Sequence, residues 1–409
     1  MNRSTQIFAV VAGLAAGGSM AQTDGQTDTR TFQPADVFAT VPAGSLNGMA
    51  AVRSMGDDLA RIAADHNTTP AELAQWFRSD MSLYLTPSGR LLNVCPPAPL
   101  ENPENGDAPE IAGRIFDEDI PLDDFDQLES IPGAEKTVYL DIDGHFSTGN
   151  SWGHSINFPP YNTASGTGVF TDQEKSDIIE HWKEVAEDFA PFNVNVTTKD
   201  PGVAALVRSN GSDTRFGIRV VMTQPTSGFG NGIGGVAFLN SFNDGIDNPC
   251  FAFNKGLGAG PMTVTHEAGH TFGLRHDGLN SSEYHPGSTG TGPRWGPIMG
   301  APFGDELVQW SNGDYPGATS GQNDYLVITS SSNDIDFLPD DHSDSVFSGT
   351  QATVGEPIEG VINNQSDADS FEITIPSDGD YLIRVRNAVR GPNLDAMFTL
   401  YRQDPFALV

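Results

Sequence analysis

Short runs of alternating or continuous apolar residues recur through the middle of the chain and predict its strands. Residues 138–142, 193–197 and 218–222 are such runs. Between the first two, residues 171–189 begin with a capping box and carry one apolar stripe at helical spacing, which predicts an amphipathic helix. The strand–helix–strand order predicts a right-handed parallel crossover, and therefore a domain of mixed helix and sheet.

The first quarter of the chain has its own pattern. Residues 69–77 combine a capping box, a proline at the first helical position and apolar side chains, which predicts a helix. Residues 83–85 and 91–94 flank a Thr-Pro-Ser-Gly turn and predict a hairpin. A proline-rich and then acidic stretch follows. It favours an exposed linker, either between a removable pro-region and the rest or between two ordinary domains.

The candidate chemistry is concentrated in one run. On a helix, His266 and His270 share a face because they lie four residues apart, and both can bind one metal ion. Glu267 lies between them, within reach of a water molecule at that ion. Gly273 can end the helix in a left-handed turn, which brings His276 back as a third ligand. Three protein ligands leave a position open, as in catalytic zinc sites.

This run, from His266 to Asp277, resembles the zinc signature of the metzincin metalloendopeptidases, H-E-x-x-H-x-x-G-x-x-H. Asp277, directly after the third histidine, resembles the reprolysin (adamalysin) branch. Metzincins also carry a methionine beneath the metal, called the Met-turn. Met299, in the sequence Gly-Pro-Ile-Met-Gly, lies at a suitable distance downstream and is the candidate.

The resemblance implies a metzincin-like catalytic domain of the α+β or α/β kind, a mixed twisted sheet with an active-site helix. It implies that Zn²⁺ is held by His266, His270 and His276 and that Glu267 is the general base in hydrolysis of internal peptide bonds. A short strand at residues 234–239 would be the edge strand to which a peptide or protein substrate adds.

The pattern changes near residue 340. Strand-like apolar positions alternate with glycines, which predicts a small all-β sandwich. The stretch from Asp367 to Phe371, with Gly379 and Tyr381, resembles the pre-peptidase C-terminal domain of secreted bacterial proteases. The resemblance ends at Val409, before the last strands would be expected, so we expect a partial domain with a role in export or localisation.

The chain begins with an expected export signal. A short basic start, an apolar centre at residues 7–16 and small residues before Gln22 are typical of one, and an interfacial or buried helix is the alternative. We therefore expect a secreted, extracellular zymogen. Its expected parts are a signal peptide (1–21), a pro-region with acidic linker (22–132), a catalytic domain (133–338) and the C-terminal domain (339–409).

Composition excludes some partners. The 409 residues carry a net charge of −33, which argues against nucleic acid and anionic membranes. The same carboxylates can supply ligands for Ca²⁺ as a further cofactor. Substrate identity and oligomeric state have no signal in the sequence. A zinc hydrolase of non-peptide substrates and an inactive extracellular binding protein are the alternative functions.

The chain has only two cysteines, Cys95 and Cys250. Cys95 lies in the expected pro-region, where its thiolate could occupy the open metal position as a cysteine switch. A disulfide between Cys95 and Cys250 is the second possibility, and two free structural thiols are the third.

Overall fold

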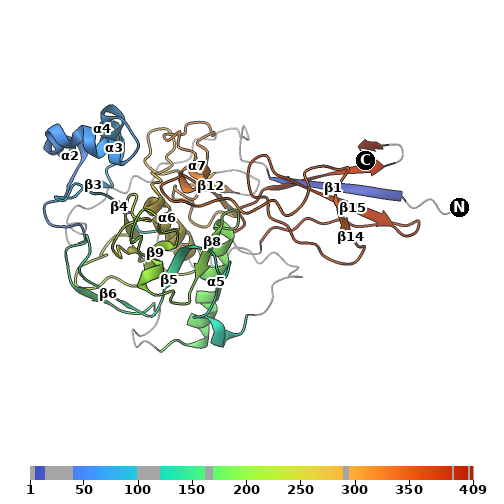
Figure 1. Cartoon of the computed structure of the whole chain (residues 1–409), viewed down its shortest axis with the longest axis horizontal. Helices are drawn as coiled ribbons and strands as arrows, with labels where there is room; N and C mark the ends of the chain where they lie inside the picture. The colour runs from blue at the N-terminus through green and yellow to red at the C-terminus, as the bar shows by residue number, and fades with distance from the viewer. Residues whose placement is uncertain are drawn as a thin grey trace.

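The computed structural model describes residues 5–13, 40–98, 120–161, 169–288, 294–388, 391–403 and 406–408. Its largest element is a mixed sheet with the strand order β2-β3-β4-β10-β11-β9-β5-β8 (Figure 1). These strands are β2 (Leu46–Asn47), β3 (Leu83–Leu85), β4 (Leu91–Cys95), β5 (Lys136–Asp141), β8 (Val194–Thr197), β9 (Phe216–Met222), β10 (Gly235–Phe238) and β11 (Cys250–Ala252).

The middle of this sheet follows the predicted pattern. β8, β5, β9 and β11 are parallel neighbours, and β10 runs antiparallel to β11. Helix α5 (Asp172–Asp188) connects β5 to β8, and the predicted capping box is present at its start. The mixed α/β class and the parallel crossover are thus confirmed. β11 was not predicted, because its three residues are too few to show a period.

Helix α6 (Gly260–Phe272) carries the histidine run and is buried along its whole length. It contacts β9, β10 and β11 as well as α5. Its apolar residues Val264, Ala268 and Phe272 join the core between helices and sheet. An apolar cluster of this size fixes the position of the helix relative to the sheet, because each buried side chain must fill its space without voids.

The N-terminal unit consists of helices α2 (Gly48–Met55), α3 (Leu59–Asp65) and α4 (Pro70–Ser79) with the hairpin β3–β4. The predicted helix and hairpin are both confirmed, including the capping box of α4. The unit has a small core of its own, which also takes in Leu239 from the end of β10. Since β4 pairs with β10, the unit extends the central sheet.

The C-terminal region differs from the predicted sandwich. Its described strands form one sheet in the order β14-β15-β1-β16-β17. Residues around Ile358 and Tyr381, expected as strands, are not strands; both side chains are exposed, and the described strands form no second sheet over them. The strands are β14 (Thr350–Ala352), β15 (Ala368–Ile375), β16 (Ala396–Gln403), β17 (Phe406–Leu408) and, from the other end of the chain, β1 (Thr5–Gly13).

Strand β1 is the segment interpreted above as the centre of an export signal. It lies between β15 and β16 and is antiparallel to both. The export signal itself stays a prediction. Among the described residues, no helix is long and apolar enough to cross a membrane.

The remaining elements are short. They are the strand pairs β6 (His145–Ser147) with β7 (Ile156–Phe158) and β12 (Trp295–Pro297) with β13 (Leu307–Gln309), helix α7 (Asp324–Ile328), and the 3₁₀ turns at Gly56–Asp58, Leu122–Asp124 and Val203–Ala205.

The core beneath α6 gives a first prediction. The ring of Phe242 is fully buried, with its centroid 4.5 Å from that of Phe272 on α6 and 5.5 Å from that of Phe216 on β9. Phe242→Ala should lower the free energy of unfolding by about 3–5 kcal/mol, measured by urea denaturation. Phe347→Ala is the control, since that ring is 81% exposed and its loss should change little. Equal effects of the two substitutions would contradict this account of the core.

Candidate metal centre

The end of α6 sets the geometry of the site. Gly273 caps the helix in the left-handed region at φ 106°, as the sequence predicted. The backbone N–H of Leu274 then donates to the carbonyl of Gly269, and the chain turns back over the helix. This turn returns His276 to the face that carries His266 and His270. The three predicted metal ligands are therefore brought together.

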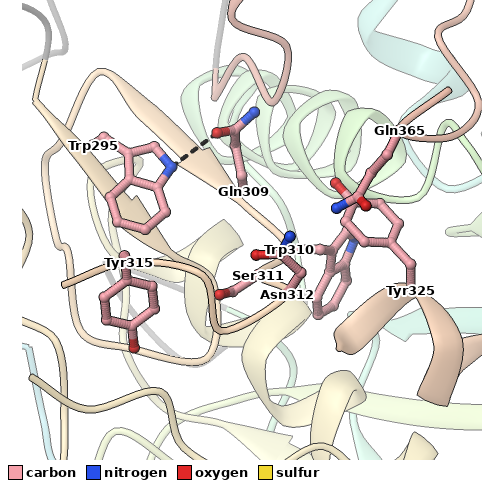
Figure 2. A pocket seen from close by; sticks show the side chains of 8 residues that line it. All are labelled: Trp295, Gln309, Trp310, Ser311, Asn312, Tyr315, Tyr325 and Gln365. Carbon is pink, nitrogen blue, oxygen red and sulfur yellow. Dashed lines mark hydrogen bonds between the residues drawn. The ribbon is translucent and has the colours of Figure 1, made fainter. Parts of the chain in front are cut away.

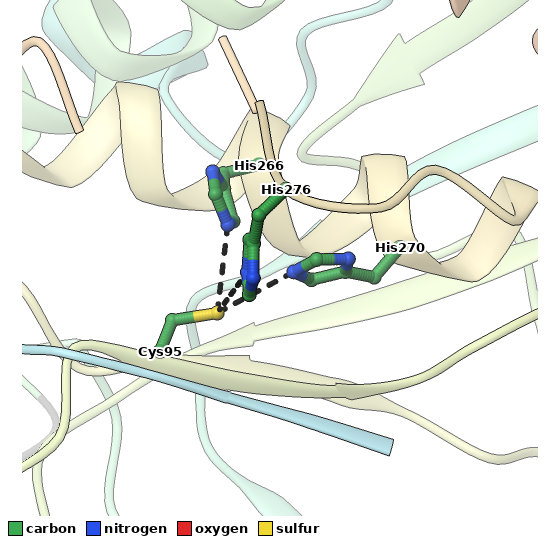
Figure 3. Close-up of side chains that lie close together, drawn as sticks. All are labelled: Cys95, His266, His270 and His276. Carbon is green, nitrogen blue, oxygen red and sulfur yellow. Dashed lines mark hydrogen bonds between the residues drawn. The ribbon is translucent and has the colours of Figure 1, made fainter. Parts of the chain in front are cut away.

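The imidazoles meet at the thiol of Cys95, which comes from the N-terminal unit. Its Sγ atom lies 3.5 Å from Nε2 of His266, 3.4 Å from Nε2 of His270 and 3.5 Å from Nε2 of His276 (Figure 3). All four side chains are buried. Three nitrogens and one sulfur that converge on one point could hold a metal ion.

The outer nitrogens of the three rings are also fixed. Each Nδ1 lies at hydrogen-bond distance from an oxygen to which it can donate, which leaves Nε2 as an acceptor that faces the centre. The pairs are His266 Nδ1 with the carbonyl of Ile298 at 2.8 Å, His270 Nδ1 with the carbonyl of Leu274 at 2.8 Å, and His276 Nδ1 with Asp80 Oδ2 at 3.0 Å.

Burial keeps these rings neutral. It lowers the pKa of His266 to about 3 and of His276 to about 4, and it holds the pKa of His270 well below its ordinary value. A positive charge on a neighbouring histidine ring would lower the pKa values of His266 and His270 further. A neutral imidazole is the form that ligates a metal, so the site is prepared for one at neutral pH.

Glu267 lies beside the cluster on α6. Its side chain is fully buried, and neither carboxylate oxygen has a hydrogen-bond partner among the described residues. Burial raises its pKa well above the usual value. The carboxylate packs against the backbone of β10 at Gly235, where any Cβ would collide with Oε1. Glu267 therefore lies buried beside the cluster, in surroundings that favour its protonated form.

Met299 lies under the helix. It is fully buried, and a Cβ on Gly269 would come within 2.6 Å of its Sδ. The segment around it also holds the site: the carbonyl of Ile298 lies 2.8 Å from Nδ1 of His266, and the carbonyl of Met299 accepts from the backbone N–H of Asp277, next to His276, at 2.8 Å. Asp277 is buried next to His276 in sequence, but its carboxylate is not part of the converging set.

Several residues at the site were not predicted. Asp80 binds His276, and Glu283 accepts the backbone N–H groups of Met81 and Ser82, so two carboxylates join the N-terminal unit to the metal centre. The ring of Tyr284 lies with its centroid 4.2 Å from that of His276, and its buried hydroxyl has no hydrogen-bond partner within the described residues. No local pattern marks these residues: Asp80 lies 196 positions from His276, and Glu283 and Tyr284 lie in a loop without a periodic pattern.

The two cysteines are both free thiols. Cys250 lies on β11, where its Sγ contacts the carbonyl of Arg219, while the thiol of Cys95 faces the histidines. The disulfide considered from the sequence is therefore not formed. Burial raises the pKa of the Cys95 thiol, and the charge of Glu267 adds to this rise.

A shallow pocket opens next to the centre. Besides Cys95, His266 and Glu267, its lining is mainly apolar and includes Met262, Ala301 and Phe303. A second pocket shares none of these residues (Figure 2). It is lined by Trp295, Gln309, Trp310, Ser311, Asn312, Tyr315, Tyr325 and Gln365.

Comparison with known protein families, with curated proteins and with solved structures finds no match.

The ligand geometry predicts that the site loses its metal ion when any one of the three histidines is replaced. The purified full chain should contain one transition-metal ion at this centre, and His270→Ala should remove most of it, as measured by elemental analysis after dialysis. His145→Ala is the matched control, since His145 lies near Asp141, outside the cluster. Full metal content in His270→Ala would contradict the assignment.

Proposed function

We propose that this chain is a zinc-dependent endopeptidase of the metzincin type, close to the reprolysin branch, made as a latent precursor. The observation that carries the proposal is the convergence of three histidine Nε2 atoms beside a buried, unpaired glutamate on the same helix. The peptidase fold, the protein or peptide substrates and export from the cell are parts of the same proposal.

The donor set fits zinc. Zinc bonds of about 2.0–2.1 Å to nitrogen and about 2.3 Å to sulfur, in a tetrahedron, imply S···N separations of roughly 3.6 Å. The three observed separations are 3.4–3.5 Å. Imidazole and thiolate together favour zinc over calcium or magnesium, which prefer oxygen. His266, His270 and His276 would hold the ion, with Cys95 as a fourth ligand in the precursor.

A bound zinc ion supplies Lewis acidity, which polarises a peptide carbonyl and acidifies water. The protein supplies the rest. Glu267 accepts the proton of the attacking water and passes it to the leaving amine, a role suited to its raised pKa and its lack of competing partners. Tyr284, whose buried hydroxyl has no partner, is placed to donate a hydrogen bond to the developing oxyanion. Met299 and Ile298 keep the histidine rings in position.

The N-terminal unit supports the idea of a latent precursor. β4 pairs antiparallel with β10, with Cys95 opposite Gly235 and Leu92 opposite Phe238. β10 is the strand to which an extended peptide would add, so β4 takes the place of a substrate. The same strand ends at the thiol that faces the histidines. One segment thus blocks both the backbone-binding edge and the metal position, and activity would require its departure.

The two alternative functions make different demands on the site. A hydrolase of non-peptide substrates would not need a strand edge over the metal, and the pairing of β10 with an extended segment favours a peptide. An inactive binding protein would not need Glu267 buried without a partner, which costs free energy in the folded state. Both features favour the peptidase.

The general-base role of Glu267 gives the next prediction. In a chain whose N-terminal unit has been cut away and removed, Glu267→Gln should lower kcat for a peptide substrate by roughly a hundredfold or more, because amide nitrogen cannot accept the proton. Metal content should stay at the wild-type level, since Glu267 is not a ligand. The control is Glu187→Gln, on α5. Retained turnover in Glu267→Gln would rule out the proposed mechanism.

The thiol gives an independent prediction. In the uncut chain, Cys95→Ala should raise peptidase activity on a small peptide toward that of the processed enzyme, because it opens the fourth metal position. Cys250→Ala removes the other buried thiol and should leave the precursor silent. If both variants stay silent while metal content is normal, strand β4 alone maintains latency and the thiol is not required.

A further inference from the structure

A second set of ligand atoms lies at the junction between the catalytic region and the C-terminal sheet. Asp340, Asp367 and Asp369 each contribute one carboxylate oxygen to a group within 4.8 Å of one another. Asp340 lies two residues after Leu338, whose backbone N–H donates to the carbonyl of Pro191. Asp367 and Asp369 flank the start of β15.

Two of these carboxylates are buried, and one oxygen of each lacks a hydrogen-bond partner among the described residues. Asp367 is 5% exposed and Asp369 is 3% exposed, and Oδ1 of each has no hydrogen-bond partner among the described residues. The other oxygen of Asp367 accepts from the backbone N–H of Asn363 at 2.6 Å. Burial of an unpaired carboxylate oxygen costs free energy, and two side by side cost more because their charges repel.

No cationic side chain neutralises the group. Among the described residues, no lysine or arginine forms an ion pair with Asp340, Asp367 or Asp369. The nearest base, His342, has both ring nitrogens in use: Nδ1 lies 2.9 Å from the hydroxyl of Thr350, and Nε2 lies 2.7 Å from the carbonyl of Glu359. Both ring nitrogens are thus engaged, and the atoms free to bind are oxygens.

Electrostatics agrees with this geometry. Burial raises the pKa of Asp369 to about 7, and the charges of Asp341 and Asp367 contribute to the rise. Burial also raises the pKa of Asp367. A cation between the carboxylates would remove the repulsion and satisfy the unpaired oxygens.

We propose that Asp340, Asp367 and Asp369 form a calcium site that fastens the junction to the first long strand of the C-terminal sheet. A set made only of carboxylate oxygens suits a hard cation, and calcium accepts the irregular geometry that a loop and a strand start provide. Asp340 is exposed, so the ion can enter from solvent, and Asp341 is next to it to add charge. The site shares no residue with the histidine centre and does not depend on the proposed peptidase activity.

Calcium binding to the full chain tests the proposal directly. After removal of calcium on a chelating resin, the protein is titrated with calcium chloride in equilibrium dialysis. The double variant Asp367→Asn/Asp369→Asn should bind one equivalent fewer than the wild type. Calcium should also raise the Tm of the wild type and not that of the variant.

The matched control is Asp378→Asn/Asp380→Asn. It changes the same charge at the same spacing in the same region, and both side chains are exposed. This control should bind calcium as the wild type does. Equal stoichiometry in the wild type and the Asp367→Asn/Asp369→Asn variant would overturn the proposal.

A third variant covers the case in which the buried double substitution does not fold, judged by circular dichroism. Asp340→Asn changes an exposed ligand and should weaken calcium affinity roughly tenfold. Unchanged affinity in Asp340→Asn would then overturn the site. Zinc content measured on the same samples should stay constant, which separates failure here from failure of the histidine centre.

Discussion

The contact between the thiol of Cys95 and three histidine nitrogens is the point on which this arrangement depends. It joins two parts of the chain that are about 170 positions apart. The thiol arrives there because β4 pairs with β10, and that pairing satisfies backbone groups of β10 that would otherwise lie at an open edge. The backbone ladder sets the position of the strand, and the position of the strand sets the position of the sulfur.

Around this contact the protein buries several ionisable groups. Glu267, Asp80 and Glu283 have raised pKa values and the three histidines have lowered ones, in each case mainly through burial. Burial thus favours the uncharged form of every group. A dication at the centre would stabilise the charged thiolate and carboxylate, against the effect of burial. It also requires neutral imidazole, the form that burial already favours. The buried groups of this site could thus hold a metal ion.

The features of the site that depend on local chemistry could be predicted from the sequence. His266, His270 and Glu267 follow from helical spacing, and Gly273 follows from the conformation that a helix end requires. Asp80 could not be predicted, because it reaches the site from a segment 196 positions away. Glu283 and Tyr284 follow His276 in a loop, where no periodic pattern shows which side chains turn toward the site. The prediction of a C-terminal sandwich was wrong for a related reason. Alternation around Ile358 and Tyr381 indicates a half-buried strand only if something covers it, and in the structure those side chains are exposed.

The core of the N-terminal unit has one further consequence. Leu239, directly after β10, is part of that core, so the unit and the rest of the central sheet share apolar surface as well as a strand ladder. While the chain is continuous, the two parts meet as one molecule, at a high effective concentration. A cut in the connecting segment would turn the same contact into a complex of two chains. Under the proposed function, release from inhibition would then depend on dilution: the cut chain would stay inactive where it is concentrated and become active where it spreads.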